Sequence, residues 1–291
     1  MWWIPVTLIA AAAQTGRNAA QRGLTAQIGT MGATAVRFVF GLPFALAALA
    51  LWAIWHPIPM PGSEAMGWFL MGSVAQIAAT ALMLVTMQSR SFGVTTALLK
   101  TEPVTVALIG AVLLGDRLSG PMLLAIATAT AGVMLMSGLH WRGGAWRAAV
   151  LGVVSGGLFG LTAIGVRGGV LALPFGSEVT RAVTALVITQ TLQTVIILLW
   201  LALRDRTALR GMMRLWRSSL GAGFLGAFAS LFWFTGFAMT SAANVRTLGL
   251  VEVVMAQIVS GRVLREGVTR RQIAGMALVL GGVAALIAVA V

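Results

Sequence analysis

Long apolar stretches constrain this chain more than any other feature. Hydrophobic residues make up 59% and charged residues 9% of the 291 residues, which is outside the range of ordinary water-soluble domains. Stretches of about 20 apolar residues, enough to cross roughly 30 Å of hydrocarbon, recur along the sequence. They lack the apolar and polar alternation of a membrane β-barrel, so helices must satisfy the backbone polar groups in lipid. The sequence predicts an all-α integral membrane protein.

Charges, prolines and glycine clusters divide the chain into ten predicted transmembrane helices. They cover residues 2–22, 32–55, 66–89, 94–114, 119–138, 147–168, 179–203, 216–239, 242–263 and 269–290.

Cysteine is absent, which excludes disulfides, thiolate metal sites and thiol nucleophiles. The net charge of +13 comes from arginines scattered singly or gathered in short loops. This distribution favours contact with a lipid bilayer over binding to nucleic acid.

Two carboxylates, Glu102 and Glu252, lie inside predicted helices four and nine, near their middles. An ionisable group near the bilayer centre costs roughly 2.5–3.5 kcal/mol on insertion scales, so it is usually kept for a task. As a functional pair, the two residues would bind a cationic group or couple transport to protons. The alternative is a buried ion pair that locks helices together.

The chain also resembles itself. A shift of 150 residues places Glu102 on Glu252, Asp116 on Glu266 and Gly132 on Gly282, and a shift of 145 places Arg22 on Arg167. The two halves, 1–138 and 139–291, each hold five predicted helices. Because five is odd, the second copy enters the membrane inverted, as in secondary transporters whose substrate sites lie at the repeat interface near the midplane. We therefore expect two inverted five-helix repeats.

The first predicted helix carries a polar face formed by Gln14, Arg17, Asn18 and Gln21, whose spacings of three and four place them together. An arginine fork can bind a carboxylate or phosphate in a bidentate manner, which makes Gln14, Arg17 and Asn18 candidate substrate-binding residues. In the alternative, Arg17 extends to the membrane surface from a nearby helix end.

Other polar and aromatic residues complete the candidate site. Lys100 is two positions from Glu102, roughly 200° around a helix, so its partner is either Glu252 or a substrate anion. Gln76 lies on a weaker stripe with Ser73 and Thr80, for which polar contact between helices is the alternative. The remaining candidates are Trp233 as part of an aromatic wall, Asn244 and Gln257 beside Glu252, Arg37 and Arg181 as structural anchors, and Pro103 as a kink within helix four.

The ten-helix duplicated layout resembles the EamA branch of the drug/metabolite transporter superfamily. The likeness is carried by ALLKTEPVTVALIGAVLLGDRLSG, followed by the glycine-bearing ATAGVMLM, and by Arg37 in VRFVFGLPFA. The resemblance covers essentially the whole chain and implies transport, with export favoured over import. Where the family often has a Trp-Gly-Ser-Asn-like stretch in the first helix, this chain reads Gln14-Thr15-Gly16-Arg17.

Loop arginines predict the orientation. The connection between predicted helices two and three has no arginine, whereas its counterpart carries Arg204, Arg206, Arg210, Arg214 and Arg217. The arginine-rich loop should face the cytoplasm. Arg117, Arg167 and Arg246 fall on the opposite side in this arrangement. Both termini are then expected outside the cytoplasm of a bacterial-type inner membrane, although members of the family are usually drawn with cytoplasmic termini.

These features together predict a secondary transporter working by alternating access, without a cofactor or metal. The basic and acidic candidates together favour a zwitterionic small molecule, such as an amino acid or derivative, with protons or a counter-solute as coupling partners. A carrier of aromatic or cationic drugs or flavins is the alternative within this class. A membrane enzyme and a structural subunit are alternatives from other classes. The sequence contains no Walker-type loop, metal cluster or catalytic constellation, so we expect no enzyme activity.

Overall fold

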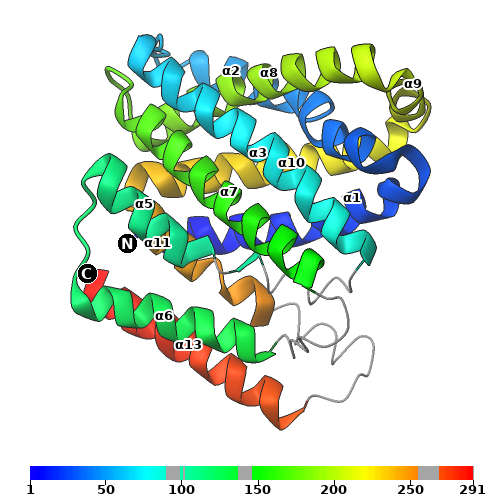
Figure 1. Ribbon diagram of the computed structural model, residues 1–291. Helices are drawn as coiled ribbons and strands as arrows, with labels where there is room; N and C mark the ends of the chain where they lie inside the picture. Colours follow the sequence, from blue (N-terminus) through cyan, green and yellow to red (C-terminus); the bar gives the residue numbers. More distant parts are fainter. Residues whose placement is uncertain (90–98, 101, 137–145, 255–268, 291) are drawn as a thin grey trace.

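The computed structural model describes residues 1–89, 99–100, 102–136, 146–254 and 269–290. Every regular element in these ranges is an α-helix (Figure 1). The helices are α1 (Trp3–Val39), α2 (Leu42–Ala53), α3 (Ser63–Ser89), α5 (Glu102–Leu114), α6 (Gly120–Met136), α7 (Trp146–Leu171), α8 (Glu178–Arg204), α9 (Arg206–Arg214), α10 (Trp216–Met239), α11 (Ala242–Leu248) and α13 (Arg270–Ala290). The all-helical fold class is therefore confirmed for the described ranges.

Six segments within these ranges are long and apolar enough to cross a membrane. They are Ala20–Ala53, Ser63–Gln88, Val150–Leu171, Glu178–Arg204, Trp216–Met239 and Arg270–Val289. α5 and α6 are shorter apolar helices. Side chains such as Val112, Leu124 and Leu199 stand exposed on outward faces, where hydrocarbon is a better solvent for them than water. The chain is a multi-pass membrane protein; the ten-helix arrangement in two repeats stays a prediction.

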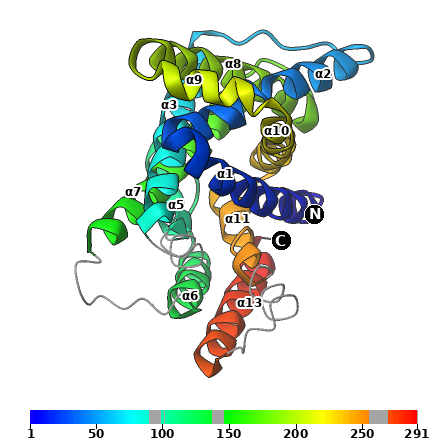
Figure 2. The ribbon, with the colours of Figure 1, turned by 90° about the vertical axis from the view of Figure 1, so that its right-hand side faces the viewer.

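Three close helix pairs organise the molecule: α3 packs along α7, α1 along α10, and α6 along α13. The α6–α13 pair lies at one side, and α2, α8 and α9 lie at the opposite side, with the other two pairs between them (Figures 1 and 2). α5 packs on α7 and on α11 in the space between the central pairs and α6–α13. The start of α1 lies near the end of α13 in both views.

The contact between α6 and α13 depends on glycines of both helices, Gly132 on α6 and Gly275 and Gly282 on α13. A Cβ added to Gly132 would lie 2.7 Å from both the carbonyl oxygen of Gly275 and the amide nitrogen of Val279. A Cβ added to Gly282 would lie 2.6 Å from the amide nitrogen of Ala129. No side chain fits at these distances, so the two backbones touch directly, as small residues allow in membrane helix pairs.

The connection expected between residues 22 and 32 is a kink at a single residue. α1 runs from Trp3 to Val39 as two helical arms that meet at Gly29, with φ 70° and ψ 175°. Glycine has no Cβ and adopts this left-handed backbone readily. The side chain of Gln21 spans the bend by donating a hydrogen bond to the carbonyl oxygen of Ala33, 2.9 Å away. The bend therefore separates two helical arms of α1.

Candidate functional site

Two buried ion pairs lie close to the start of α5 and to α11. Lys100 lies in a turn next to α5, and its Nζ is 2.7 Å from Oε2 of Glu252. Glu102 is the first residue of α5, and its Oε1 is 2.9 Å from Nε of Arg246 in α11. The Glu102 and Arg246 atoms are close but lack the geometry of a hydrogen bond. All four side chains are buried, so each charge depends on its partner.

The expected mid-helix positions of the two carboxylates were wrong. Glu102 begins α5, where the positive end of the helix dipole favours a carboxylate. Pro103 therefore falls in the first turn, whose backbone N–H groups have no partner within the helix, and it does not kink the helix interior as expected. Glu252 follows a turn at Gly249 and Leu250 that ends α11. Neither acid therefore lies in the middle of a helix: Glu102 is the first residue of α5, and Glu252 is two residues beyond the turn at Leu250.

Arg246 is the main residue that sequence reasoning missed. It had been assigned to the membrane side opposite the arginine-rich loop, but it lies inside α11 and is buried. Its guanidinium covers the ring of Trp233 at 4.5 Å and that of Phe237 at 5.2 Å, which is cation–π geometry. The ring of Trp233, which was expected to form part of an aromatic wall, is therefore in contact with Arg246. The sequence signal that could have identified Arg246 was Glu102, because a buried carboxylate needs a cation as its partner.

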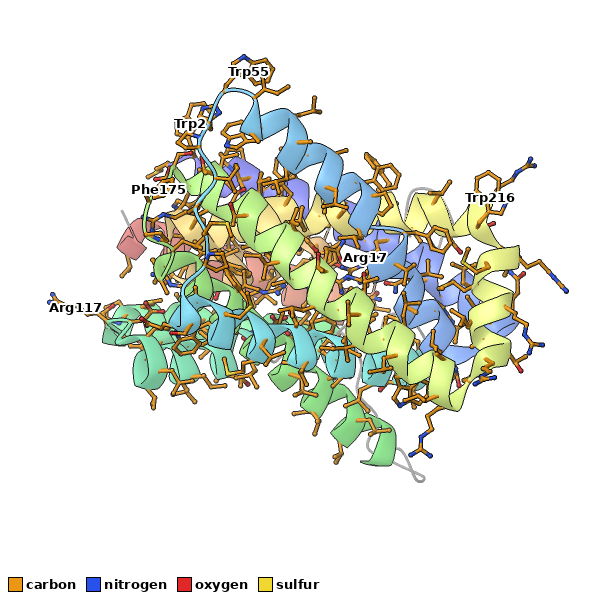
Figure 3. All side chains as sticks on the ribbon, turned by 90° about the horizontal axis from the view of Figure 1, so that it is seen from above. Trp2, Arg17, Trp55, Arg117, Phe175 and Trp216 are labelled. Carbon is orange, nitrogen blue, oxygen red and sulfur yellow. The ribbon has the colours of Figure 1, made fainter. Side chains whose placement is uncertain are left out.

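The polar face of α1 is turned into the molecule. Arg17 is 1% exposed and lies well inside α1, in the middle of the molecule (Figure 3). The alternative that it reaches the membrane surface is wrong. Nη2 of Arg17 donates a hydrogen bond to Oδ1 of Asn18 at 2.6 Å, and Nε2 of Gln14 donates to Oε2 of Glu252 at 3.5 Å. α1 thereby connects its polar face to the Lys100–Glu252 pair.

Arg37, in the last turn of α1, and the polar stripe of α3 form a second polar region. Arg37 donates from Nη1 to Oγ1 of Thr80 at 3.2 Å and from Nη2 to Oγ of Ser230 at 3.4 Å. Oε1 of Gln76 accepts a hydrogen bond from Nε2 of Gln193, 2.6 Å away. These bonds join α1, α3, α8 and α10, which agrees with polar contact between helices as the role of the α3 stripe. Arg181 bonds to the backbone carbonyl groups of Gly176 and Val170 near the start of α8.

Asn244, on α11, bonds to the end of α10 rather than to a member of an ion pair. Its Nδ2 donates to Oγ1 of Thr240 at 3.0 Å, and it lines a pocket of about 230 Å³ together with Arg117, Ser119 and Ser241. A second pocket, of about 400 Å³, lies between α1 and α3 and includes Arg22 and Met87 in its lining. Gln257, the last candidate, lies outside the described residues.

A third ion pair joins the end of α5 to α7. Nη2 of Arg167 lies 3.4 Å from Oδ1 of Asp116, and Nη1 donates to the backbone carbonyl oxygens of Phe237 and Thr240. Those two carbonyl groups belong to the end of α10, where orphan acceptors and the negative end of the dipole favour a cation. Arg167 lies in α7, within the helix predicted over 147–168, and it caps a neighbouring helix.

Comparisons with known proteins agree with this architecture. The model of a family described as "EamA-like transporter family" matches residues 1–138 and 146–288. A solved structure described only as "Crystal structure of protein" superposes with a TM-score of 0.72, covering 98% of this chain and 97% of that chain at 13% identity. This likeness concerns the fold alone. The comparison with curated proteins found no match.

Proposed function

From the premise that the chain belongs to the EamA-like transporter family, as its sequence motifs suggested, we propose that it is a secondary transporter of a small polar or zwitterionic metabolite, such as an amino acid or derivative. The family consists of transporters, and we expect no enzyme activity. The observation that carries the proposal is a cluster of buried, paired charges inside an apolar helical membrane protein. Charged side chains in that setting are expensive and commonly mark a substrate or ion pathway.

Both buried ion pairs join the two predicted repeats. Lys100 and Glu102 belong to the first half, and their partners Glu252 and Arg246 belong to the second. Alternating access requires the two halves to move against each other around a site at their interface. We propose that substrate charges exchange with these pairs during the movement. Protonation of Glu102 or Glu252 would also release its cation, which is our proposed route for coupling transport to protons.

The helix pairing supports the inverted-repeat proposal. A shift of 150 residues carries α3 onto α10 and α6 onto α13, while a shift of 144 to 145 carries α1 onto α7. The α3–α7 and α1–α10 pairs exchange under these shifts, and α6–α13 maps onto itself. The glycine contacts follow the same relation. The shift of 150 residues relates Gly132 to Gly282 and Ala125 to Gly275. A Cβ added to Gly132 would meet the carbonyl oxygen of Gly275, and a Cβ added to Gly282 would lie 2.8 Å from the carbonyl oxygen of Ala125. Such exchange is expected from a two-fold relation between halves.

Arginine placement supports our proposed orientation in a bacterial-type inner membrane. Arg206, Arg210 and Arg214 are exposed on α9, which joins α8 to α10 near Trp216. Trp2 and Arg117 lie toward the opposite end of the molecule (Figure 3). The positive-inside rule then places α9 in the cytoplasm and the N-terminus outside it. Since the chain has no cysteine, a single cysteine introduced at Arg210 should react with a membrane-impermeant maleimide only after the cytoplasmic face is opened.

Export is the direction we propose, because the family resemblance favours it. A carrier of aromatic or cationic drugs or flavins is less favoured, because Arg246 already covers the ring of Trp233. No described residue provides a cluster of three or more acidic or histidine side chains that could hold a metal ion.

The test is counterflow of labelled amino acids into proteoliposomes containing the purified protein. We expect saturable flux that Glu252→Gln abolishes, because Lys100 loses its carboxylate. The matched control is Glu64→Gln, which changes an exposed carboxylate on α3 and should leave flux unchanged. Absence of saturable flux for every solute would refute the proposal. In the single variant Glu102→Gln, which keeps Glu252, we expect flux without its pH dependence. Proton coupling through Glu102 is refuted if the pH dependence of flux survives in that variant.

A further inference from the structure

Buried charge in the described residues is unbalanced toward the positive. The buried cations are Arg17, Arg37, Lys100 and Arg246, whereas the buried carboxylates are only Glu102 and Glu252. Each carboxylate has a close cation, Lys100 for Glu252 and Arg246 for Glu102. Arg17 and Arg37 remain, and within the described ranges neither has a carboxylate oxygen within 4.0 Å. Two guanidinium groups therefore stand in the interior without a direct counter-ion.

The bend in α1 brings these two arginines to one place. They are twenty positions apart, which would separate them by about 30 Å along a straight helix. Because α1 bends at Gly29, both arms pack along α10. A Cβ added to Gly226 of α10 would lie 3.0 Å from Cγ of Arg37 and 3.6 Å from Cδ of Arg17. We call Arg17 and Arg37, where they meet Gly226, the two-arginine site.

The groups around the two-arginine site are neutral or only partly compensating. Arg37 bonds to the hydroxyl groups of Thr80 and Ser230. Arg17 bonds to the amide oxygen of Asn18, and its buried Nη1 has no hydrogen-bond partner in the described structure. The charge of Glu252 acts on Arg17 from beyond ion-pair distance. An ionised group in such surroundings is costly unless it is paired and hydrogen-bonded, and arginine cannot lose its proton to avoid that cost.

We infer that the two-arginine site binds an oxyanion, a carboxylate or phosphate group of the transported solute, and that the transporter therefore prefers solutes with net negative charge. This inference rests on the proposed function and makes its substrate class narrower. The planar fork of each guanidinium matches the two oxygens of a carboxylate or phosphate. Binding would give the orphan Nη1 an acceptor and bring the buried charge closer to balance. The buried carboxylates Glu252 and Glu102 are already paired with Lys100 and Arg246, so they would bind a cationic solute less favourably than unpaired carboxylates.

Competition in proteoliposomes tests the inference. Counterflow driven by a labelled solute is measured against unlabelled glutamate, succinate, inorganic phosphate, glycine and lysine. We expect inhibition by glutamate, succinate or phosphate at concentrations well below those needed for lysine, with succinate against phosphate distinguishing carboxylate from phosphate recognition. Arg17→Gln should raise the KM for the anionic solute about 10-fold or more, the range for losing a charge-assisted hydrogen bond, and Arg17→Lys should restore part of the loss. Arg210→Gln on exposed α9 is the matched control and should behave as wild type.

A second measurement keeps the inference testable if Arg17→Gln misfolds or no flux is found. The apparent melting temperature of the wild-type protein in detergent should rise with succinate, glutamate or phosphate at fixed ionic strength and not with lysine, because a ligand of the folded state stabilises it. Saturable flux with equal inhibition by anions and lysine would overturn the inference and leave the proposed transport intact. Stabilisation by anions without flux of any solute would support the site and count against transport. Equal melting temperatures in all solutes would overturn the site.

Discussion

Removing one partner of the Lys100–Glu252 pair should destabilise the protein by an amount that depends on which partner is lost. Glu252→Gln leaves Lys100, whose side chain is 9% exposed, without its carboxylate. Among the described residues, it also leaves Glu102 as the one buried acid against four buried cations. An uncompensated buried charge typically costs about 3–5 kcal/mol. Lys100→Met is milder, because Glu252 keeps the hydrogen bond from Gln14 and the charge of Arg17 nearby, so we expect about 1–3 kcal/mol.

Equilibrium unfolding in mixed micelles, followed by the fluorescence of the ten tryptophans, measures these differences. The double variant Lys100→Met, Glu252→Gln should cost less than the sum of the single variants, because it leaves neither charge unpaired. Glu64→Gln, at an exposed position of α3, controls for the change of a carboxylate to an amide. The reasoning is refuted if the single effects add within about 0.5 kcal/mol, or if Lys100→Met is the more destabilising change.

Three further substitutions test the packing with the same unfolding measurement. Gly282→Ala should destabilise by about 1–3 kcal/mol, because the new Cβ meets backbone atoms of α6, whereas Gly281→Ala, which has open space, should change stability little; equal effects would contradict the close contact. Gly29→Ala should cost about 1–3 kcal/mol, because a residue with a Cβ is strained at φ 70° and ψ 175°; a neutral effect would mean that the bend tolerates other backbone angles. Arg167→Gln should destabilise more than Asp116→Asn, which leaves the bonds of Arg167 to the carbonyl oxygens of α10 and should cost no more than about 1 kcal/mol at this half-buried pair; the reverse order would refute capping as the main role of Arg167.

Hydropathy was sufficient to predict the helical class, and the motif beginning at Ala97 was sufficient to predict the family. Hydropathy could not place the ends of the helices, because apolar content alone does not show where a backbone turns. The bend at Gly29 needs one dihedral angle that no residue count reveals. The turn before Glu252 similarly divides a stretch that looked continuous.

The sequence identified both acidic residues of the two buried ion pairs but only one of their two basic partners. Glu102, Glu252 and Lys100 stood out because charges are rare in apolar stretches, and Glu252 was one of the two partners expected for Lys100. Arg246 was missed, since an arginine near a predicted helix end looks like a membrane-surface residue until packing shows what surrounds it. Arg17 and Arg37 come close to each other only because α1 bends at Gly29, and the sequence did not predict this proximity either.

The contacts between the predicted halves differ in how much movement they tolerate. Backbone atoms of α6 and α13 touch at Gly132 and Gly282 with no side chain between them, so sliding there would produce clashes at once. The pairs Lys100–Glu252 and Arg246–Glu102 connect the halves through long, flexible side chains, which can change partners while the helices shift by an ångström or two. We therefore expect α6 and α13 to move as one unit, with the rearrangement of alternating access concentrated at the charged centre between α1, α5 and α11.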